Sequence, residues 1–352
     1  MLKKLMLPVF LSVLLLFGNT YALIASEHDE APVGEEHFML PDEDEPQSDA
    51  AELDSLADYE EVEIELNARL DGQYNILSDF TDRLAFRRGE TPIIITGIIE
   101  GAIFFGFDQD IHENLKAEIL SLPGIDEELI DFHNLTINWS GPRRLSEAEQ
   151  KATQHEVIDL SDPLVARNLG ELRMGSLVRL YGADWTVGPP TNNLGSGFYT
   201  ANHGVLLDGD GVFVRGTTPS VGYVDNWVVG SAGDASRVRF TSSWIWVGHN
   251  LSNLRGSMPR EGSRVTALGG VSGNISGTIY ANDLTVRGMH DPYGRPVVLN
   301  NMTMVVGMRA RPGDSGAALI SGTSAVGIMS FGGYDPGVGD YVFFTPIRNL
   351  PF

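Results

Sequence analysis

The stretch around Ser315 contains residue types that could perform nucleophilic catalysis. It reads Gly313-Asp314-Ser315-Gly316 and runs directly into a short apolar segment. A serine hydroxyl attacks poorly unless a base removes its proton, and the usual base is a histidine oriented by a carboxylate. Gly, Asp and Ser are also the commonest turn residues, so this stretch alone favours an ordinary turn. The rest of the chain must supply the histidine and the carboxylate.

The order of the candidate residues along the chain narrows the chemistry. No histidine follows Ser315, which argues against the α/β-hydrolase arrangement, where the histidine comes last. His203 follows the run 197–201, which predicts a strand that ends just before it. Asp234 comes 31 residues later, at the start of an alternating run, and Ser315 another 81 residues on. The order His, Asp, Ser is that of a known protease triad, and the separations leave room for several strands.

The elements that must position these residues are short strands. From about residue 175 the chain consists of apolar or alternating runs separated by Gly, Asn, Asp and Pro, which predicts an all-β barrel or sandwich. Within 91–150, "TPIIITGIIEGAIFFGF" predicts two strands, "DQDIHENLKAEILSLPG" a helix and "DFHNLTINW" another strand. We expect a small α+β unit there. Residues 23–90 are acidic and low in hydrophobicity, and we expect them to be largely disordered.

Composition divides the chain in the same places. Residues 1–22 have a basic start, an apolar run and a small-residue end, typical of a signal peptide for secretion. Residues 23–150 carry 32 acidic and 7 basic residues, whereas 151–352 carry 15 of each and 31 of the 40 glycines. We read 151–174 as a linker and 175–352 as the catalytic domain. The chain has no cysteine, no later segment long enough to span a bilayer, and no basic cluster that would indicate nucleic acid.

Four segments together resemble chymotrypsin-like (trypsin-like) serine proteases, in particular the secreted bacterial streptogrisin and glutamyl-endopeptidase group. They are "TANH" ending at His203, "DASRV" beginning at Asp234, "GDSG" around Ser315, and "GIMSFGG" at 327–333. The resemblance covers roughly residues 170–352. It implies two six-stranded antiparallel Greek-key β-barrels. It also implies an exported protein that hydrolyses protein or peptide substrates without a metal or other cofactor and without stable membrane association.

The resemblance also assigns roles to individual residues. His203 is the general base, Asp234 orients it, and Ser315 is the nucleophile. The backbone N–H groups of Gly313 and Ser315 form the oxyanion hole, and Asp314 stabilises the loop. The substrate-binding residues are Ala310, Ser330, Phe331 and Gly332. The sequence departs from the family pattern at two positions. Gly204 stands where a cysteine is common, and Ala317 stands where a glycine is common.

The resemblance implies that the acidic N-terminal half is a propeptide, acting as an intramolecular inhibitor or folding aid, so that the chain is a zymogen. The alternative is a catalytically silent, protease-like binding domain. The cleavage specificity stays open between apolar and acidic residues, although Met329 replaces a histidine expected in glutamyl-specific relatives. Other aspartates between His203 and Ser315 remain alternatives to Asp234, namely Asp208, Asp210, Asp225, Asp283 and Asp291.

Overall fold

The structure is a computed structural model that describes residues 50–87, 94–107, 113–137, 171–180, 183–214, 220–243 and 245–352. The expected signal peptide, the acidic residues 23–49 and most of the expected linker lie outside these ranges. Within them, no helix is both long enough and apolar enough to cross a membrane.

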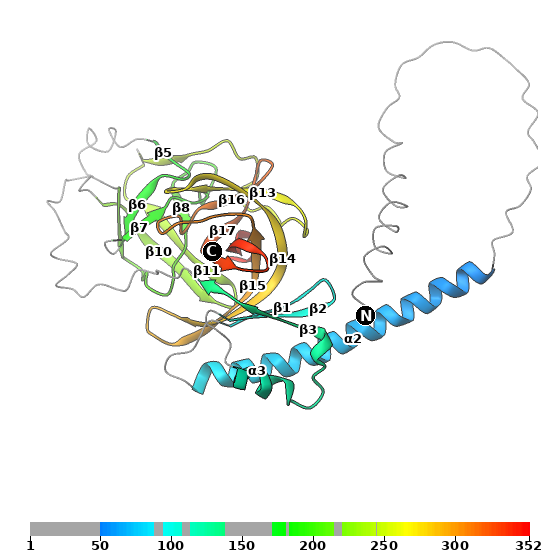
Figure 1. Ribbon diagram of the computed structural model, residues 1–352. Coiled ribbons are helices and arrows are strands. Elements are labelled where there is room, and N and C mark those ends of the chain that lie inside the picture. The colour runs from blue at the N-terminus through cyan, green and yellow to red at the C-terminus, as the bar shows by residue number, and fades with distance from the viewer. Residues whose placement is uncertain are drawn as a thin grey trace, which may run out of the picture. The chain divides into compact units, whose positions relative to one another are not determined.

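Two antiparallel barrels of six strands each form the C-terminal half of the chain (Figure 1). The first barrel contains β6 (Leu177–Leu180), β7 (Ala183–Thr186), β8 (Gly197–Thr200), β9 (Gly211–Val214), β10 (Ser220–Gly230) and β11 (Gly233–Phe240). The second contains β13 (Arg264–Gly269), β14 (Gly273–His290), β15 (Pro296–Val306), β16 (Ala318–Ser321), β17 (Ser324–Asp335) and β18 (Gly339–Pro346). When the strands are numbered within each barrel, both follow the same cyclic order, 1-4-5-6-3-2. The prediction of two six-stranded Greek-key barrels is confirmed.

Each barrel closes around its own apolar core. The first closes where the chain after β7 reaches β8, through a bridge between Pro190 and Phe198. The second closes through direct pairing of β13 with β14. Alternating strand residues fill the interiors, with Trp185 and Phe198 fully buried in the first barrel and Phe343 in the second. Burial of this apolar surface is the main driving force for folding, which suits a chain without disulfides.

A small α+β unit precedes the barrels, as the sequence predicted. It consists of β1 (Ile94–Ile99), β2 (Ala102–Phe107), α3 (Glu113–Leu120), a 3-10 turn (Glu127–Leu129), β3 (Ile130–Asn134) and β4 (Thr136–Ile137). β1 and β2 form an antiparallel hairpin, and β3 lies parallel to β2. Leu135 separates β3 from β4.

A long helix, α2 (Ala50–Arg87), occupies a segment that we expected to be largely disordered, and for this part that expectation is wrong. Leu70 and Leu77 are buried, with Leu66 and Tyr74 partly buried beside them, against the apolar face of β1–β3. The spacing of these residues places them on one face of a helix. The average composition is acidic, but a stripe of apolar residues is sufficient to pack the helix on the sheet.

The α+β unit continues the sheet of the second barrel. β1 pairs antiparallel with the distal part of β14, with Thr96 opposite Thr285. β4 pairs antiparallel with β17, where Ile137 faces Gly333 and Thr136 faces Tyr334. The two pairings attach the unit to two strands of the same barrel.

The barrel region begins slightly earlier than predicted. β5 (Glu171–Arg173) pairs in parallel with β12 (Trp246–Gly248), a short strand that follows the first barrel. Residues 171–173 therefore belong with the barrels, although the sequence placed them in the linker. A strand of three residues is too short for its alternation to give a clear local signal.

Candidate active site

The structure brings His203 and Asp234 together. His203 lies three residues after β8, and Asp234 is the second residue of β11. Nδ1 of His203 is 3.0 Å from Oδ2 of Asp234, and the N–H of His203 donates to Oδ1 over 2.6 Å. The N–H of Asn202 donates to the same Oδ1 over 3.0 Å. One carboxylate therefore holds both the ring and the backbone of the histidine.

Asp234 is fully buried, yet its surroundings stabilise the ionised form of its carboxyl group. Burial acts to raise the pKa of Asp234, because a buried carboxylate loses its hydration. The charge of His203 and hydrogen bonds from His203 and Ser330 act in the opposite direction, and the pKa of Asp234 is lowered overall. The carboxylate is thus ionised at neutral pH, as required of a group that stabilises an imidazolium beside it.

Ser330 belongs to this hydrogen-bonded group. Its hydroxyl donates to Oδ2 of Asp234, the oxygen that also faces His203. The sequence predicted Ser330 on the wall of the substrate pocket, whereas its buried side chain is directed at the carboxylate. The 96 residues between the two positions explain why no local pattern showed this contact.

The backbone around His203 is tightly constrained. His203 has a φ of +56° and Gly204 a φ of +68°, both in the left-handed region. A Cβ on Gly204 would lie 1.8 Å from the carbonyl oxygen of His290, so no larger residue fits. Glycine in place of the expected cysteine therefore allows the C-terminal end of β14 to approach the backbone next to His203 closely. The ring of Trp185 stacks on His203, with centroids 4.8 Å apart.

Two glycines shape the loop that carries Ser315. Gly313 and Gly316 have φ values of +100° and +93°, which other residues adopt only with strain. A Cβ on Gly316 would lie 2.0 Å from Oγ1 of Thr200, and one on Gly313 would lie 2.7 Å from a methyl group of Val271. At both positions, therefore, the positive φ and the nearby atoms favour glycine over a residue with a side chain.

Asp314 anchors the same loop. Its Oδ1 accepts the N–H groups of Val271 and Ser272 over 2.8 and 3.0 Å, and its Oδ2 accepts the N–H of Arg311 over 2.8 Å. Asp314 is fully buried, and its charge is met by these backbone dipoles. This arrangement fits the stabilising role that the sequence suggested for it.

A pair of adjacent residues in the first barrel links the histidine to the serine loop. Trp185 stacks on His203, and the N–H of the next residue, Thr186, donates to the carbonyl oxygen of Ser315 over 2.9 Å. The strand β7 therefore contacts both parts of the site within two residues.

A second pair, on β17, makes the corresponding link from the other barrel. Met329 accepts the N–H of Gly316 over 2.8 Å through its carbonyl oxygen, and the next residue, Ser330, binds Asp234. Both pairs place the loop of Ser315 beside the His203–Asp234 pair, at the junction of the barrels. The fold thus gathers the three candidate catalytic residues.

The N–H groups of Gly313 and Ser315 are available to a ligand. Neither donates a hydrogen bond to any of the described residues. Unpartnered backbone donors in a loop with left-handed glycines are typical of anion-binding concavities such as oxyanion holes.

The predicted substrate-binding residues divide into two groups. A Cβ on Gly332 would lie 3.6 Å from Cβ of Ala310, so these two positions face each other. Phe331 instead packs inside the second barrel, stacked on Phe343 with centroids 4.9 Å apart. The side chains of Ser330 and Phe331 therefore do not line a pocket, and at these positions only the backbone is left for substrate.

Two of the alternative aspartates are committed to arginines. Asp225 accepts from Nε of Arg237 over 2.7 Å, and Asp291 accepts from Nε of Arg295 over 2.6 Å. These pairs offer each carboxylate a partner other than a histidine.

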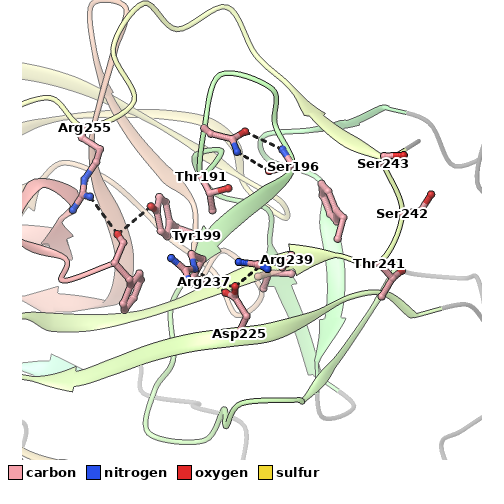
Figure 2. A pocket seen from close by; sticks show the side chains of 14 residues that line it. Thr191, Ser196, Tyr199, Asp225, Arg237, Arg239, Thr241, Ser242, Ser243 and Arg255 are labelled. Carbon is pink, nitrogen blue, oxygen red and sulfur yellow. Dashed lines mark hydrogen bonds and ion pairs between the residues drawn. The ribbon is translucent and has the colours of Figure 1, made fainter.

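A pocket of about 570 Å³ lies on the first barrel and is lined by residues outside the candidate triad. Figure 2 shows the side chains that line it. Its charged groups are engaged within the protein, where Arg237 and Arg239 share Asp225. Arg255 donates to backbone carbonyl oxygens, including that of Phe352 over 3.2 Å. This pocket has both polar and apolar lining residues, and none of them belongs to the candidate active site.

Comparisons with known proteins place these findings in context. No protein-family model matches the chain. A Nocardiopsis protease shares 28% identity, over 51% of this chain and 94% of that one, with a TM-score of 0.41. Thermobifida fusca protease A shares 29% over 51% and 93% (TM-score 0.40), and a Cellulomonas bogoriensis chymotrypsin 23% over 51% and 92% (TM-score 0.40). The solved structures to which this chain is similar, over about half of its length, are chymotrypsin-like serine proteases.

Proposed function

We propose that this chain is a secreted serine endopeptidase, made as a zymogen with an inhibitory N-terminal prosegment. The observation that carries the proposal is the hydrogen-bonded group His203–Asp234–Ser330 next to the loop of Ser315. A buried, ionised carboxylate on Nδ1 fixes the orientation of the ring and stabilises the imidazolium that forms when Nε2 takes up a proton. This is the arrangement required for base-assisted attack by serine.

In the proposed mechanism, Nε2 of His203 accepts the proton of the Ser315 hydroxyl as Oγ attacks the scissile carbonyl carbon. The carbonyl oxygen becomes an oxyanion that the N–H groups of Gly313 and Ser315 bind. The imidazolium then protonates the leaving amine, and the C–N bond breaks to give an acyl-enzyme. Water, deprotonated by the same histidine, releases the acid and restores Ser315.

Asp234 supports both halves of this cycle by stabilising the imidazolium and fixing the ring. Ser330 in turn positions Asp234. Each oxyanion donor typically contributes about 3–4 kcal/mol of barrier lowering, because it acts in a site shielded from water.

The prosegment proposal has its own support. β4 lies on the edge of β17 at Gly333, directly beyond Gly332, which the sequence assigned to substrate binding. An extended peptide gains main-chain hydrogen bonds by adding to such an edge. A segment of the chain that holds this edge competes with substrate for it.

Reaction with a serine-directed fluorophosphonate tests the catalytic proposal. We expect stoichiometric labelling at Ser315, abolished in Ser315→Ala, with no labelling at the buried Ser330. If the processed protein, from which the prosegment has been removed, is folded but hydrolyses no peptide and takes up no label, the result would favour the alternative, a catalytically silent binding domain.

Maturation is tested separately by N-terminal sequencing of the secreted protein. Because composition changes between residues 150 and 175, we expect the mature enzyme to begin there. A dominant species beginning before residue 130 would contradict this expectation.

A further inference from the structure

Thr186, the last residue of β7, makes two contacts with the loop that carries Ser315. Its hydroxyl donates to the carbonyl oxygen of Gly313 over 2.7 Å, and its N–H donates to the carbonyl oxygen of Ser315 over 2.9 Å. The N–H groups of Gly313 and Ser315 themselves make no hydrogen bond with the described residues. One residue of the first barrel therefore holds the carbonyl groups of both proposed oxyanion donors.

A second partner fixes the hydroxyl of Thr186. The N–H of Gly270, in the turn between β13 and β14, donates to Oγ1 of Thr186 over 3.0 Å. A Cβ on Gly270 would lie 2.7 Å from the same Oγ1, so glycine allows this close approach. Because Oγ1 accepts from Gly270, its own proton is left for the carbonyl oxygen of Gly313.

The surroundings of Thr186 define the position of its side chain. Thr186 is fully buried, and its carbonyl oxygen accepts the hydroxyl of Thr200 over 3.2 Å. Every polar atom of Thr186 therefore has a partner. Rotation of the side chain would leave a buried hydroxyl without hydrogen bonds, which costs free energy. The contact with Gly313 is thus favoured over other orientations of the hydroxyl.

The loop of Ser315 needs such an anchor. Gly313 and Gly316 give its backbone more conformational freedom than other residues would. A hydrogen bond to the carbonyl oxygen of a residue limits rotation about its φ and ψ, and so limits the direction of its N–H. Donors stabilise an oxyanion best when they are in position before the reaction. Asp314 attaches the loop to the turn between β13 and β14, and Thr186 attaches it to the first barrel.

We propose that Thr186 is a positioning residue of the oxyanion hole, and that its hydroxyl keeps the N–H groups of Gly313 and Ser315 directed at the substrate carbonyl oxygen. Thr186 does not touch the reacting atoms and acts through the carbonyl group of Gly313. The proposal rests on the proposed function, because these donors serve the reaction only if Ser315 is the nucleophile. It makes the first barrel a contributor to the oxyanion hole as well as to the His203–Asp234 pair.

Turnover by the processed enzyme tests the proposal with Thr186→Val, which keeps the shape of the side chain and removes the hydroxyl. We expect kcat per titrated active site to fall roughly 30-fold, less than the roughly 10²–10³-fold loss that follows removal of a donor, because both donors remain. KM should stay nearly unchanged, since Thr186 does not contact substrate. Thr186→Ser retains the hydroxyl and should restore most of kcat.

The rate of fluorophosphonate labelling gives a second kinetic measure. Oγ of Ser315 forms a bond to phosphorus, fluoride leaves, and the phosphoryl oxygen occupies the oxyanion hole during the attack. Labelling of Thr186→Val should therefore slow by a factor similar to that for kcat. The matched control is Thr303→Val, because Thr303 is also buried and its hydroxyl donates to Asn282 over 2.9 Å, away from the loop. The control should keep both rates.

Hydrogen exchange tests the anchor without catalysis, in the full chain carrying Ser315→Ala. The backbone amides of residues 186, 271 and 316 report on the loop, because they donate to residue 315, Asp314 and Met329, respectively. We expect their protection to fall about tenfold in Thr186→Val, which corresponds to the loss of one hydrogen bond. Amides of the β10–β11 pair serve as an internal reference and should keep their protection.

Equal exchange with and without Thr186→Val would overturn the proposal, and so would turnover or labelling of Thr186→Val that matches the Thr303→Val control. A Thr186→Ser enzyme as slow as Thr186→Val would also overturn it, because the hydroxyl would then have no role. Absence of label in the processed parent enzyme would instead refute the proposed function itself. The two failures are distinguishable, since one is measured on the parent and the other on the variants.

Discussion

The two barrels share one topology but differ in how they complete their sheets. The first barrel is a separate six-stranded sheet, closed by its own chain near Pro190 and Phe198. The second belongs to a ten-stranded sheet, because its 18-residue strand β14 extends beyond the barrel and pairs there with β1. The second barrel therefore presents strand edges that the N-terminal unit covers.

A buried arginine shows how strongly the second barrel depends on that unit. Arg287 of β14 is 2% exposed. Its guanidinium donates to Asp82 over 2.5 Å, to Thr96 over 2.9 Å and to Ser78 over 2.7 Å. All three partners precede the barrels in sequence. A buried charge is costly without partners, so the guanidinium on β14 depends on these N-terminal residues. None of the three hydrogen bonds involves a strand of the first barrel.

The largest expected effect tests whether the barrels act as one catalytic unit. Ser315→Ala removes the bond-forming group contributed by the second barrel, and we expect kcat to fall roughly 10⁴–10⁶-fold. The circular dichroism spectrum should not change, because alanine fits where serine does. Residual activity within tenfold of the parent would remove Ser315 from the mechanism.

Asp234→Asn is the matching test in the first barrel. The amide preserves the shape of the carboxylate but stabilises the wrong histidine tautomer, so we expect kcat to fall about 10⁴-fold. Asp225→Asn, in the same barrel but paired with arginines, is the control and should leave turnover within a few-fold. If the two variants behaved alike, the orienting carboxylate would have to be sought elsewhere.

Arg287→Met tests the dependence of the second barrel on the N-terminal unit. Loss of hydrogen bonds to a charged group should destabilise the full chain by about 2–3 kcal/mol in urea unfolding. The control is Arg173→Met, because Arg173 is 82% exposed and faces the exposed Glu171, and we expect a change below about 0.5 kcal/mol. Equal effects of the two substitutions would show that the buried contacts do not distinguish the barrels.

Ser330→Ala tests the contact between the two barrels, because Ser330 lies on the second barrel and positions the carboxylate of Asp234 on the first. We expect kcat to fall about tenfold with KM nearly unchanged, from loss of one hydrogen bond to a charged group. The conservative Ser330→Thr should restore part of the loss where its methyl group fits. An unchanged kcat in Ser330→Ala would assign the serine a packing role only.

The smallest expected effect concerns acid stability. The pKa of Asp234 is lower in the folded chain than in the unfolded chain, so its contribution is complete above the unfolded value, near pH 4. That contribution is lost as pH falls through the folded value. In the Ser315→Ala chain, Asp234→Asn should therefore destabilise more at pH 7 than at pH 2.5 in urea unfolding. The reverse order would contradict the lowered pKa.

Sequence patterns identified most of the strands because alternation and turn residues act locally. The run 197–201 contains β8, and the two strands predicted within "TPIIITGIIEGAIFFGF" are β1 and β2. The same patterns missed α2, since the acidic average of the segment concealed an apolar stripe that only packing against β1–β3 makes stable. The start of the barrel region was also missed, because the alternation of β5 extends over only three residues.

The sequence by itself determined the residue types, their order and the backbone freedom they permit. The sequence alone shows the order His203, Asp234, Ser315 and the glycine on each side of the Asp314-Ser315 pair. The chemistry of these residue types was enough to propose them as catalytic candidates. Tertiary structure alone decided which distant groups meet, such as Ser330 with Asp234 and Arg287 with Asp82. These contacts join residues about 100 or 200 positions apart, and their energies depend on burial and mutual orientation, which the fold creates and no short stretch of sequence encodes.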